Sequence, residues 1–253
     1  MARRMGAVSY DCGLLDCYPS WTPDRSIFGS LAGSNKWIGG VLAPNGKIYG
    51  MPFDATAILE IDPETRTTST FGSLAGSGKY RSGVLAPNGK IYGIPGNATA
   101  ILEIDPETRT TSTFGSLVGT NKWVGGVLAL NGKIYGIPFD PTAVLEIDPE
   151  TRTTSIFGSL AGANKWQGGV LAPNGKIYGI PFTAPTILEI DPETRTASTF
   201  GSVGAGSNKW VGGVLAPNGK IYGIPRDASI ILEIGTESPQ TLEKVLAPQL
   251  NKF

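Results

Sequence analysis

Residues 37–74 read WIGGVLAPNGKIYGMPFDATAILEIDPETRTTSTFGSL, and this stretch decides the fold because the chain repeats it. The phenylalanines that open successive copies stand 43 residues apart, at Phe28, Phe71, Phe114, Phe157 and Phe200. The first two copies differ at only seven of 43 positions. A period of about 40–45 residues is typical of solenoids and propellers, in which each unit buries a face of its neighbour. The repeat therefore predicts one domain built from five equivalent units.

Each copy contains four short apolar runs that are separated by turn signals. In the first copy the runs are residues 39–43, 47–51, 57–61 and 67–74. They are rich in Val, Ile, Leu, Tyr and Thr, which suit strands, and no window carries an apolar stripe with helical spacing. Asn45-Gly46 is expected to adopt the positive φ angles of a tight hairpin turn. In Asp62-Pro63-Glu64-Thr65, the carboxylate accepts from the backbone and the proline fixes φ.

Four antiparallel strands in each of five units predict an all-β, five-bladed β-propeller. The residues around Phe28 supply only a fourth strand, and the fifth copy loses the pattern after its third strand. We therefore expect the amino-terminal strand to complete the carboxy-terminal blade and close the ring. The alternative is that the carboxy-terminal residues supply the missing strand. The chain then divides into a flank (1–23), the propeller (24–235) and a tail (236–253).

The composition narrows the classes of partner. The 21 basic and 21 acidic residues cancel and form no long run, which argues against nucleic acid. No apolar stretch approaches the length of a membrane span, and the amino terminus lacks a signal-peptide pattern, so a cytoplasmic monomer is expected. Cys12 and Cys17 suggest free thiols or one local disulfide. A redox pair or half of a metal site is the alternative, but with no His we expect neither metal nor cofactor.

The copies differ mainly on one face of the predicted propeller. The connections between second and third strands, and the links between blades, share that face, whereas the Asn-Gly and Asp-Pro turns share the other. The varied positions that we take as candidate ligand contacts are Phe53, Asp54, Arg81, Phe139, Asp140, Phe182, Arg226 and Asp227. Loops on a rigid scaffold commonly carry binding residues. The alternative is that this face simply tolerates sequence drift.

A second candidate set lies beside the links between blades. Asn35, Lys36 and Trp37 form a motif whose aromatic position recurs as Tyr80, Trp123, Trp166 and Trp210. An aromatic ring beside an amide and an ammonium group can stack on a sugar and bind its hydroxyls. The alternative is an indole wedged between blades, with its N–H bonded to the backbone.

The repeated carboxylates favour structure over catalysis. Glu60 lies in a third strand, Lys47 lies in a second strand, and both recur in every copy, so cross-strand ion pairs are expected. An enzyme needs a unique constellation of groups with shifted pKa values. Here every such carboxylate is repeated, so we expect no enzymatic activity.

The motifs PNGKIYGIP and ILEIDPETRT resemble elements scattered through the propeller families. The whole unit resembles tandem repeats in uncharacterised propeller proteins of unicellular eukaryotes, which implies the fold and no function. PNGKIYGI alone is similar to the hairpin of tachylectin-2-type lectins. The third strand resembles that of streptogramin lyases, but those enzymes rely on a catalytic His that this chain lacks. WD40 blades use a structural His and a Trp-Asp pair, which are also missing here.

Three interpretations of function follow. The first is a binding scaffold that contacts a protein partner through the varied face. The second is a multivalent lectin with up to five sites around the repeated aromatic residues, which would gain avidity on a target with several copies. The third is an engineered or consensus-derived chain without a selected function, which the near-identity of the copies suggests.

Overall fold

The computed structural model describes residues 25–236, and within that range it contains strands and no helices. Cys12, Cys17, the predicted flank and all but one residue of the predicted tail lie outside the described part. The strands form four four-stranded antiparallel sheets and one three-stranded sheet, and each sheet is one repeat. The all-β fold and the repeated blades predicted from the sequence are therefore confirmed.

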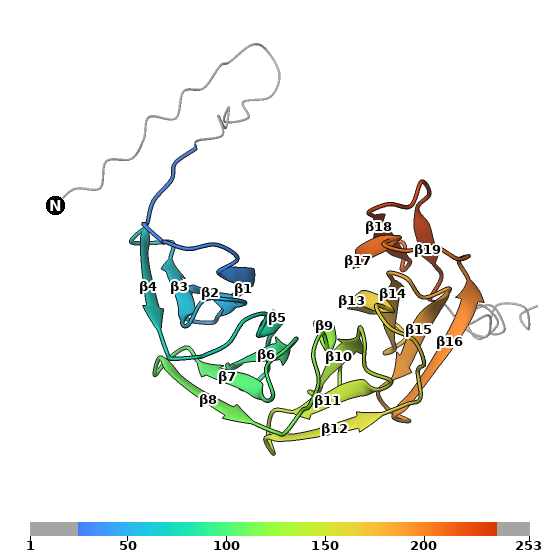
Figure 1. Ribbon diagram of the computed structural model, residues 1–253, viewed down its shortest axis with the longest axis horizontal. Helices are drawn as coiled ribbons and strands as arrows, with labels where there is room; N and C mark the ends of the chain where they lie inside the picture. The colour runs from blue at the N-terminus through green and yellow to red at the C-terminus, as the bar shows by residue number, and fades with distance from the viewer. Residues whose placement is uncertain (1–24, 237–253) are drawn as a thin grey trace, which may run out of the picture.

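The blades share one strand pattern. The first consists of β1 (Trp37–Leu42), β2 (Ile48–Pro52), β3 (Ile58–Asp62) and β4 (Thr67–Phe71). The second, third and fourth repeat it as β5 (Tyr80–Leu85), β6 (Ile91–Pro95), β7 (Ile101–Asp105), β8 (Thr110–Phe114), β9 (Trp123–Leu128), β10 (Ile134–Pro138), β11 (Val144–Asp148), β12 (Thr153–Phe157), β13 (Trp166–Leu171), β14 (Ile177–Pro181), β15 (Thr186–Asp191) and β16 (Thr196–Ser202). The fifth contains β17 (Trp210–Leu215), β18 (Ile221–Pro225) and β19 (Leu232–Ile234). Figure 1 shows the first strand of each blade on the inside of an arc and the fourth strands on the outside.

The two hairpin turns follow from their residues, with one difference from the prediction. Asp62 Oδ1 accepts hydrogen bonds from the backbone N–H groups of Glu64 and Thr65, both at 3.0 Å, as expected. In the Asn-Gly turn only Gly46 has a positive φ, of 78°. Pro44 opens a turn in which Gly46 N–H donates to the Ala43 carbonyl at 3.0 Å, and the left-handed glycine ends a three-residue loop. Asn45 uses its side chain instead, donating to Tyr49 Oη and accepting from Lys47 N–H.

The hydrophobic core lies between blades. One cluster joins Tyr49, Met51 and Ile58 of the first blade to Ile91 and Leu102 of the second, and three similar clusters join the later pairs. Glycines in the first strands allow this approach. A Cβ at Gly126 or Gly169 would lie 2.6 Å or 2.5 Å from an isoleucine of the preceding blade. Glycine in the first strands thus allows neighbouring blades to pack directly against each other.

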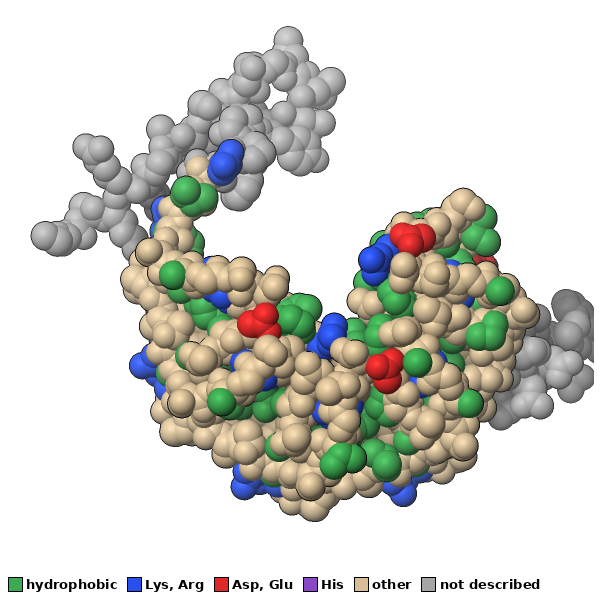
Figure 2. Space-filling view, in the orientation of Figure 1, with side chains coloured by type: hydrophobic (Ala, Val, Ile, Leu, Met, Phe, Trp, Pro, Cys, Tyr) green, Lys and Arg blue, Asp and Glu red, His purple; other side chains and the backbone are tan. Residues whose placement is uncertain are grey.

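The described chain forms an open arc, which differs from the predicted closed ring. Figures 1 and 2 show the first and last blades separated by a wide opening. Residues 25–36 form no strand, and β19 has no partner on its outer side among the described residues. The joints between blades repeat the same glycine contacts, and the five described blades span only part of a circle (Figure 1).

Candidate functional site

The varied connections gather on one side of the arc, which we call the loop rim. It consists of the second-to-third-strand loops (53–57, 96–100, 139–143, 182–185 and 226–231) and the ends of the links between blades. Backbone hydrogen bonds tie each of the first four loops to the link on either side of it: Phe53 N–H donates to Lys36 O, and Lys79 N–H donates to Phe53 O, both at 2.9 Å. The same pair of bonds recurs around Phe139 and Phe182. The structure therefore brings the varied residues together on one rigid rim.

The aromatic residues of the repeated motif do not face solvent. Trp123, Trp166 and Trp210 are 2–3% exposed, Tyr80 is equally buried, and only Trp37, in the first blade, is half-buried. The Trp166 indole N–H donates to the Thr186 carbonyl at 2.9 Å, and the other indoles make the equivalent bond. The Lys165 ammonium lies 5.8 Å from the centre of the Trp166 ring. The buried rings of Tyr80, Trp123, Trp166 and Trp210 therefore offer no free face on which a sugar can stack.

The lysine of the motif is also a structural residue in the inner blades. Lys122 is 1% exposed, and its ammonium donates to the Gly119 carbonyl at 2.8 Å. Lys165 donates to four backbone carbonyls, including those of Phe139 and Pro141. Burial lowers the pKa of Lys122 and of Lys165, the latter partly offset by Asp140. The ammonium groups therefore hold loops and links together and are not presented to a ligand.

The acidic residues of the loop rim join neighbouring blades. Asp54 Oδ1 accepts a hydrogen bond from Gly78 N–H at 2.8 Å, and Asp140 Oδ1 accepts one from Asn164 N–H at 2.9 Å. Asp227 is exposed, and its carboxylate lies 3.9 Å from Arg226 Nε. Two of the three candidate carboxylates thus use one oxygen to bind the next blade.

The remaining rim candidates form two clusters that combine cations with aromatic rings. In the first, the Arg81 guanidinium lies 5.3 Å from the centre of the Phe53 ring and donates to Asn121 Oδ1 at 2.9 Å. Arg81 Nε and Ser82 Oγ are buried without a hydrogen-bond partner among the described residues. This cluster spans the first three blades. Among the described residues, it is the one place on the loop rim where a buried donor has no hydrogen-bond partner.

The second cluster spans the last three blades. The Phe139 and Phe182 rings lie 5.6 Å apart, and the Arg226 guanidinium lies 5.4 Å from the centre of Phe182. Phe139 is half-buried and Arg226 is exposed. Arginine over an aromatic ring is a favourable, partly desolvated arrangement that is common at interfaces.

Two cavities of equivalent position open beside the links between blades. The larger, about 420 Å³, is lined by Leu160, Lys165, Trp166 and Thr199 among others. The smaller, about 290 Å³, is lined by Lys36, Trp37, Asp54 and Thr70 among others. Trp166 and Trp37 each line one of these cavities, and their indole N–H groups are bonded to the backbone.

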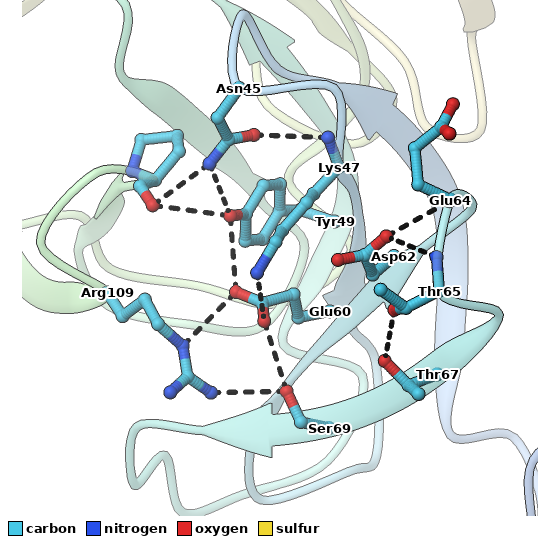
Figure 3. Close-up of polar contacts among 11 residues, drawn as sticks. Asn45, Lys47, Tyr49, Glu60, Asp62, Glu64, Thr65, Thr67, Ser69 and Arg109 are labelled. Carbon is cyan, nitrogen blue, oxygen red and sulfur yellow. Dashed lines mark hydrogen bonds and ion pairs between the residues drawn. The ribbon is translucent and has the colours of Figure 1, made fainter. Parts of the chain in front are cut away.

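The opposite side of the arc carries a repeated polar network that joins the first four blades to one another, and Figure 3 shows the copy around Glu60. Glu60 is buried and accepts from Lys47 at 3.1 Å, Tyr49 at 3.2 Å and Ser69 at 3.2 Å. Arg109 of the next blade donates to Glu60 through Nε at 3.2 Å. The predicted Glu–Lys ion pair is confirmed. The inter-blade arginine was not predicted, although its recurrence in every Asp-Pro-Glu-Thr-Arg segment was the available signal.

The network keeps its carboxylates ionised. Burial alone would raise the pKa of Glu60, but the hydrogen bond from Lys47 and the charge of Arg109 outweigh it, so the pKa is lowered. The pKa values of Glu103 and Glu146 are lowered in the same way. A general acid at neutral pH needs the opposite shift. The geometry is that of a structural joint.

These lowered pKa values predict acid sensitivity. A carboxylate whose pKa is lower in the folded state contributes stability that is complete above its ordinary value of 4.5 and is lost as the pH falls through the folded value. We expect the urea midpoint to drop steeply below pH 4.5 in a series from about pH 7 to about pH 3. Replacing Glu60, Glu103 and Glu146 together by glutamine should lower the midpoint at neutral pH and flatten the acid limb. An unchanged acid limb in the triple variant would contradict this account.

No group of three or more metal-ligating side chains occurs among residues 25–236. Nor does this part of the chain contain a helix that is long and apolar enough to cross a membrane.

Comparison with known proteins identifies relatives in structure and none in sequence. No protein-family model and no curated protein matches the chain. Among solved structures, a catalytically inactive His-to-Ala variant of virginiamycin B lyase from Staphylococcus aureus, bound to quinupristin, has a TM-score of 0.66 at 14% identity, covering 83% of this chain and 74% of the lyase. Hydrazine synthase from Kuenenia stuttgartiensis has a TM-score of 0.62 at 14% identity, covering 84% and 67%.

An auxiliary nutrient binding protein from Bacteroides ovatus is also similar, with a TM-score of 0.57 at 15% identity, covering 80% of this chain and 56% of that one. At such low identity the likeness shows the fold alone. This chain contains no His, the residue type replaced in the inactive lyase. The resemblance to tandem-repeat propellers and to a lectin hairpin remains a prediction. What the comparisons establish is a propeller-like arrangement of repeated four-stranded blades.

Proposed function

We propose that this protein is a non-catalytic binding scaffold whose loop rim holds a protein partner. The observation that carries the proposal is the contrast between the two sides of the arc. The side with the Asn-Gly and Asp-Pro turns repeats one network from blade to blade. The loop rim instead carries the Arg81 and Arg226 clusters, each different and each spanning several blades.

The residue types suit a protein interface. Arg and aromatic residues are enriched at interfaces and among the residues that dominate binding energy. The Arg81 cluster also leaves one buried N–H donor without a partner among the described residues. Because the two clusters differ, they suit an asymmetric partner better than five copies of one small ligand. The nutrient-binding neighbour is consistent with binding as a use of this fold.

The lectin interpretation has less support. It relied on exposed rings at Trp37, Tyr80, Trp123, Trp166 and Trp210, and four of these are buried. In the cavities beside Trp37 and Trp166, the indole N–H groups are already bonded to backbone carbonyls and are not free to bind a sugar. The proposal does not require the strand around Phe28 to close a ring of five blades. Each cluster of the loop rim is formed by neighbouring blades, whether or not the ring is closed.

Affinity capture with matched variants tests the proposal. The chain is immobilised and exposed to extracts of the cells that produce it. The double variant Arg81→Ala/Arg226→Ala is tested in parallel. The control is Glu107→Ala/Glu150→Ala, which changes exposed residues on the side of the arc opposite the loop rim. Loss of two interface arginines should reduce capture of a stoichiometric partner by about tenfold or more. The control should retain it. Equal capture by all three, with unchanged unfolding midpoints, would exclude the loop rim as the binding surface.

A further inference from the structure

Each end of the arc exposes one side of the contact that elsewhere joins two neighbouring blades. We call them the head face, on the first blade with residues 25–31, and the tail face, on β17–β19. We propose that the head face of one chain binds the tail face of a second copy, head to tail. The proposal concerns self-association and is independent of the partner bound by the loop rim.

The tail face carries apolar residues that every earlier blade buries. Met51, Ile94, Ile137 and Ile180 are 0% exposed because each lies against a glycine in the next blade's first strand. Ile224 is their equivalent in the fifth blade, and it is 50% exposed. The matching glycine of the head face is Gly40, beside which only Ile48 of its own blade lies within contact distance. Ile224 and Gly40 therefore have complementary shapes, but neither contacts its counterpart within this chain.

The charges of the two faces are complementary as well. Glu60, Glu103 and Glu146 each accept from an arginine of the following blade. Glu233 of the tail face is half-exposed and pairs with Lys220 of its own blade. On the head face, Arg66 is the equivalent arginine, and it donates to Ser26 and forms no ion pair with a carboxylate among the described residues. A head-to-tail contact would place Arg66 on Glu233.

The segment before the first blade already occupies the position of a preceding blade's fourth strand. Arg66 donates to Ser26 at 2.8 Å, as Arg109 donates to Ser69 at 3.1 Å. Its guanidinium lies 5.6 Å from the Phe28 ring, as that of Arg109 lies 5.2 Å from Phe71. Residues 25–31 are therefore held where the fourth strand of an added blade would run.

Among the described residues, the tail face has no fourth strand. Tyr49, Tyr92, Tyr135 and Tyr178 each pack edge-on against a phenylalanine of the fourth strand, at 5.9–6.1 Å. Tyr222 has no such ring beside it among the described residues, and the edge of β19 is unpaired there. By the repeat register, Phe28 would supply the ring and Ser26 would lie opposite Glu233, as Ser69 lies opposite Glu60. An open strand edge of this kind is a template for pairing with another chain.

A second copy fits these faces better than the same chain does. All four joints within the chain are built on the same glycine contacts, so closing the arc would require each of them to repack. Figures 1 and 2 show the two faces well apart. A second copy can use the existing joint geometry without altering the blades. Because the contact joins different faces, it repeats in series, giving a larger ring or an open helix.

Light scattering after size exclusion, over a range of concentrations, tests the association. The full chain should show a mass of at least twice the monomer, rising with concentration. Ile224→Asp, which places a charge on the tail face, should weaken association by at least tenfold. Ile156→Asp, at an equally exposed apolar position on β12, is the control and should not. A monomer at all concentrations, or oligomers that Ile224→Asp leaves intact, would overturn the proposal.

A cysteine pair identifies which chain supplies the strand. Ser26→Cys and Glu233→Cys are combined in a chain whose Cys12 and Cys17 are replaced by serine, because the register places these positions opposite each other. Mild oxidation should give disulfide-linked dimers and larger species on a non-reducing gel. A disulfide within one chain, or none at all, would overturn the proposal. The Arg81→Ala/Arg226→Ala variant should oligomerise normally, which separates this inference from the proposed function.

Discussion

Replacing Glu103 by alanine is expected to lower the free energy of unfolding by about 3 kcal/mol. Glu103 is 6% exposed and joins two blades, accepting from Lys90 and Tyr92 of its own blade and from Arg152 of the next. Removal of the carboxylate leaves two cations without their partner and a tyrosine hydroxyl with fewer bonds. Urea unfolding followed by tryptophan fluorescence measures the change.

The matched control is Glu233→Ala, at the same position of the repeat. Among residues 25–236, Glu233 pairs only with groups of its own blade, and its side chain is 46% exposed. An exposed ion pair contributes little to stability, so this variant should unfold near the parent when measured as a monomer. Equal losses in the two variants would show that the joint to the next blade contributes nothing to the role of Glu103.

Replacing Gly125 by alanine is expected to cost about 3 kcal/mol, from backbone strain and from overpacking. Gly125 has a φ of 103°, which L-residues rarely adopt, and an added Cβ would lie 2.9 Å from the Cα of Gly168 in the next blade. A backbone atom cannot move aside as a flexible side chain can. The variant should therefore separate β9 from β13, with a lower urea midpoint and faster amide exchange in both strands.

Gly212→Ala is the control for this prediction. Gly212 occupies the same repeat position with a φ of 70°, but an added Cβ meets no atom within 4 Å. It should therefore show only the strain of the left-handed backbone, about 1–2 kcal/mol. If the two variants are destabilised equally, the glycine at this repeat position is not needed for close approach between first strands.

The blades were predictable from the sequence because local signals agreed with the period. Alternating turn residues and β-branched runs located each strand of the first copy to within two residues at its start. The Asp62 turn formed as its residues indicate. The Asn45 turn did not, because the loop has three residues and only its last one, Gly46, is in the left-handed region.

Closure of the ring could not be predicted, because it depends on the rotation between neighbouring blades and not only on the number of repeats. Five copies imply five blades, but the step between blades follows from contacts such as that of Gly126 with Ile94, which the repeat does not reveal. The same limit applies to the candidate site. The position of the varied loops followed from strand alternation, whereas the burial of Trp123 and Lys122 depends on packing between blades.

Site-specific photo-crosslinking tests the central claim, that partners bind the loop rim, most directly. A photoreactive phenylalanine analogue is placed at Phe139, which is half-buried in the second rim cluster, and in a separate chain at Glu64, which is exposed on the opposite side. We predict that irradiation in cell extracts links a single partner to the Phe139 position and not to the Glu64 position. A partner that is linked through Glu64 and not through Phe139 would contradict the account.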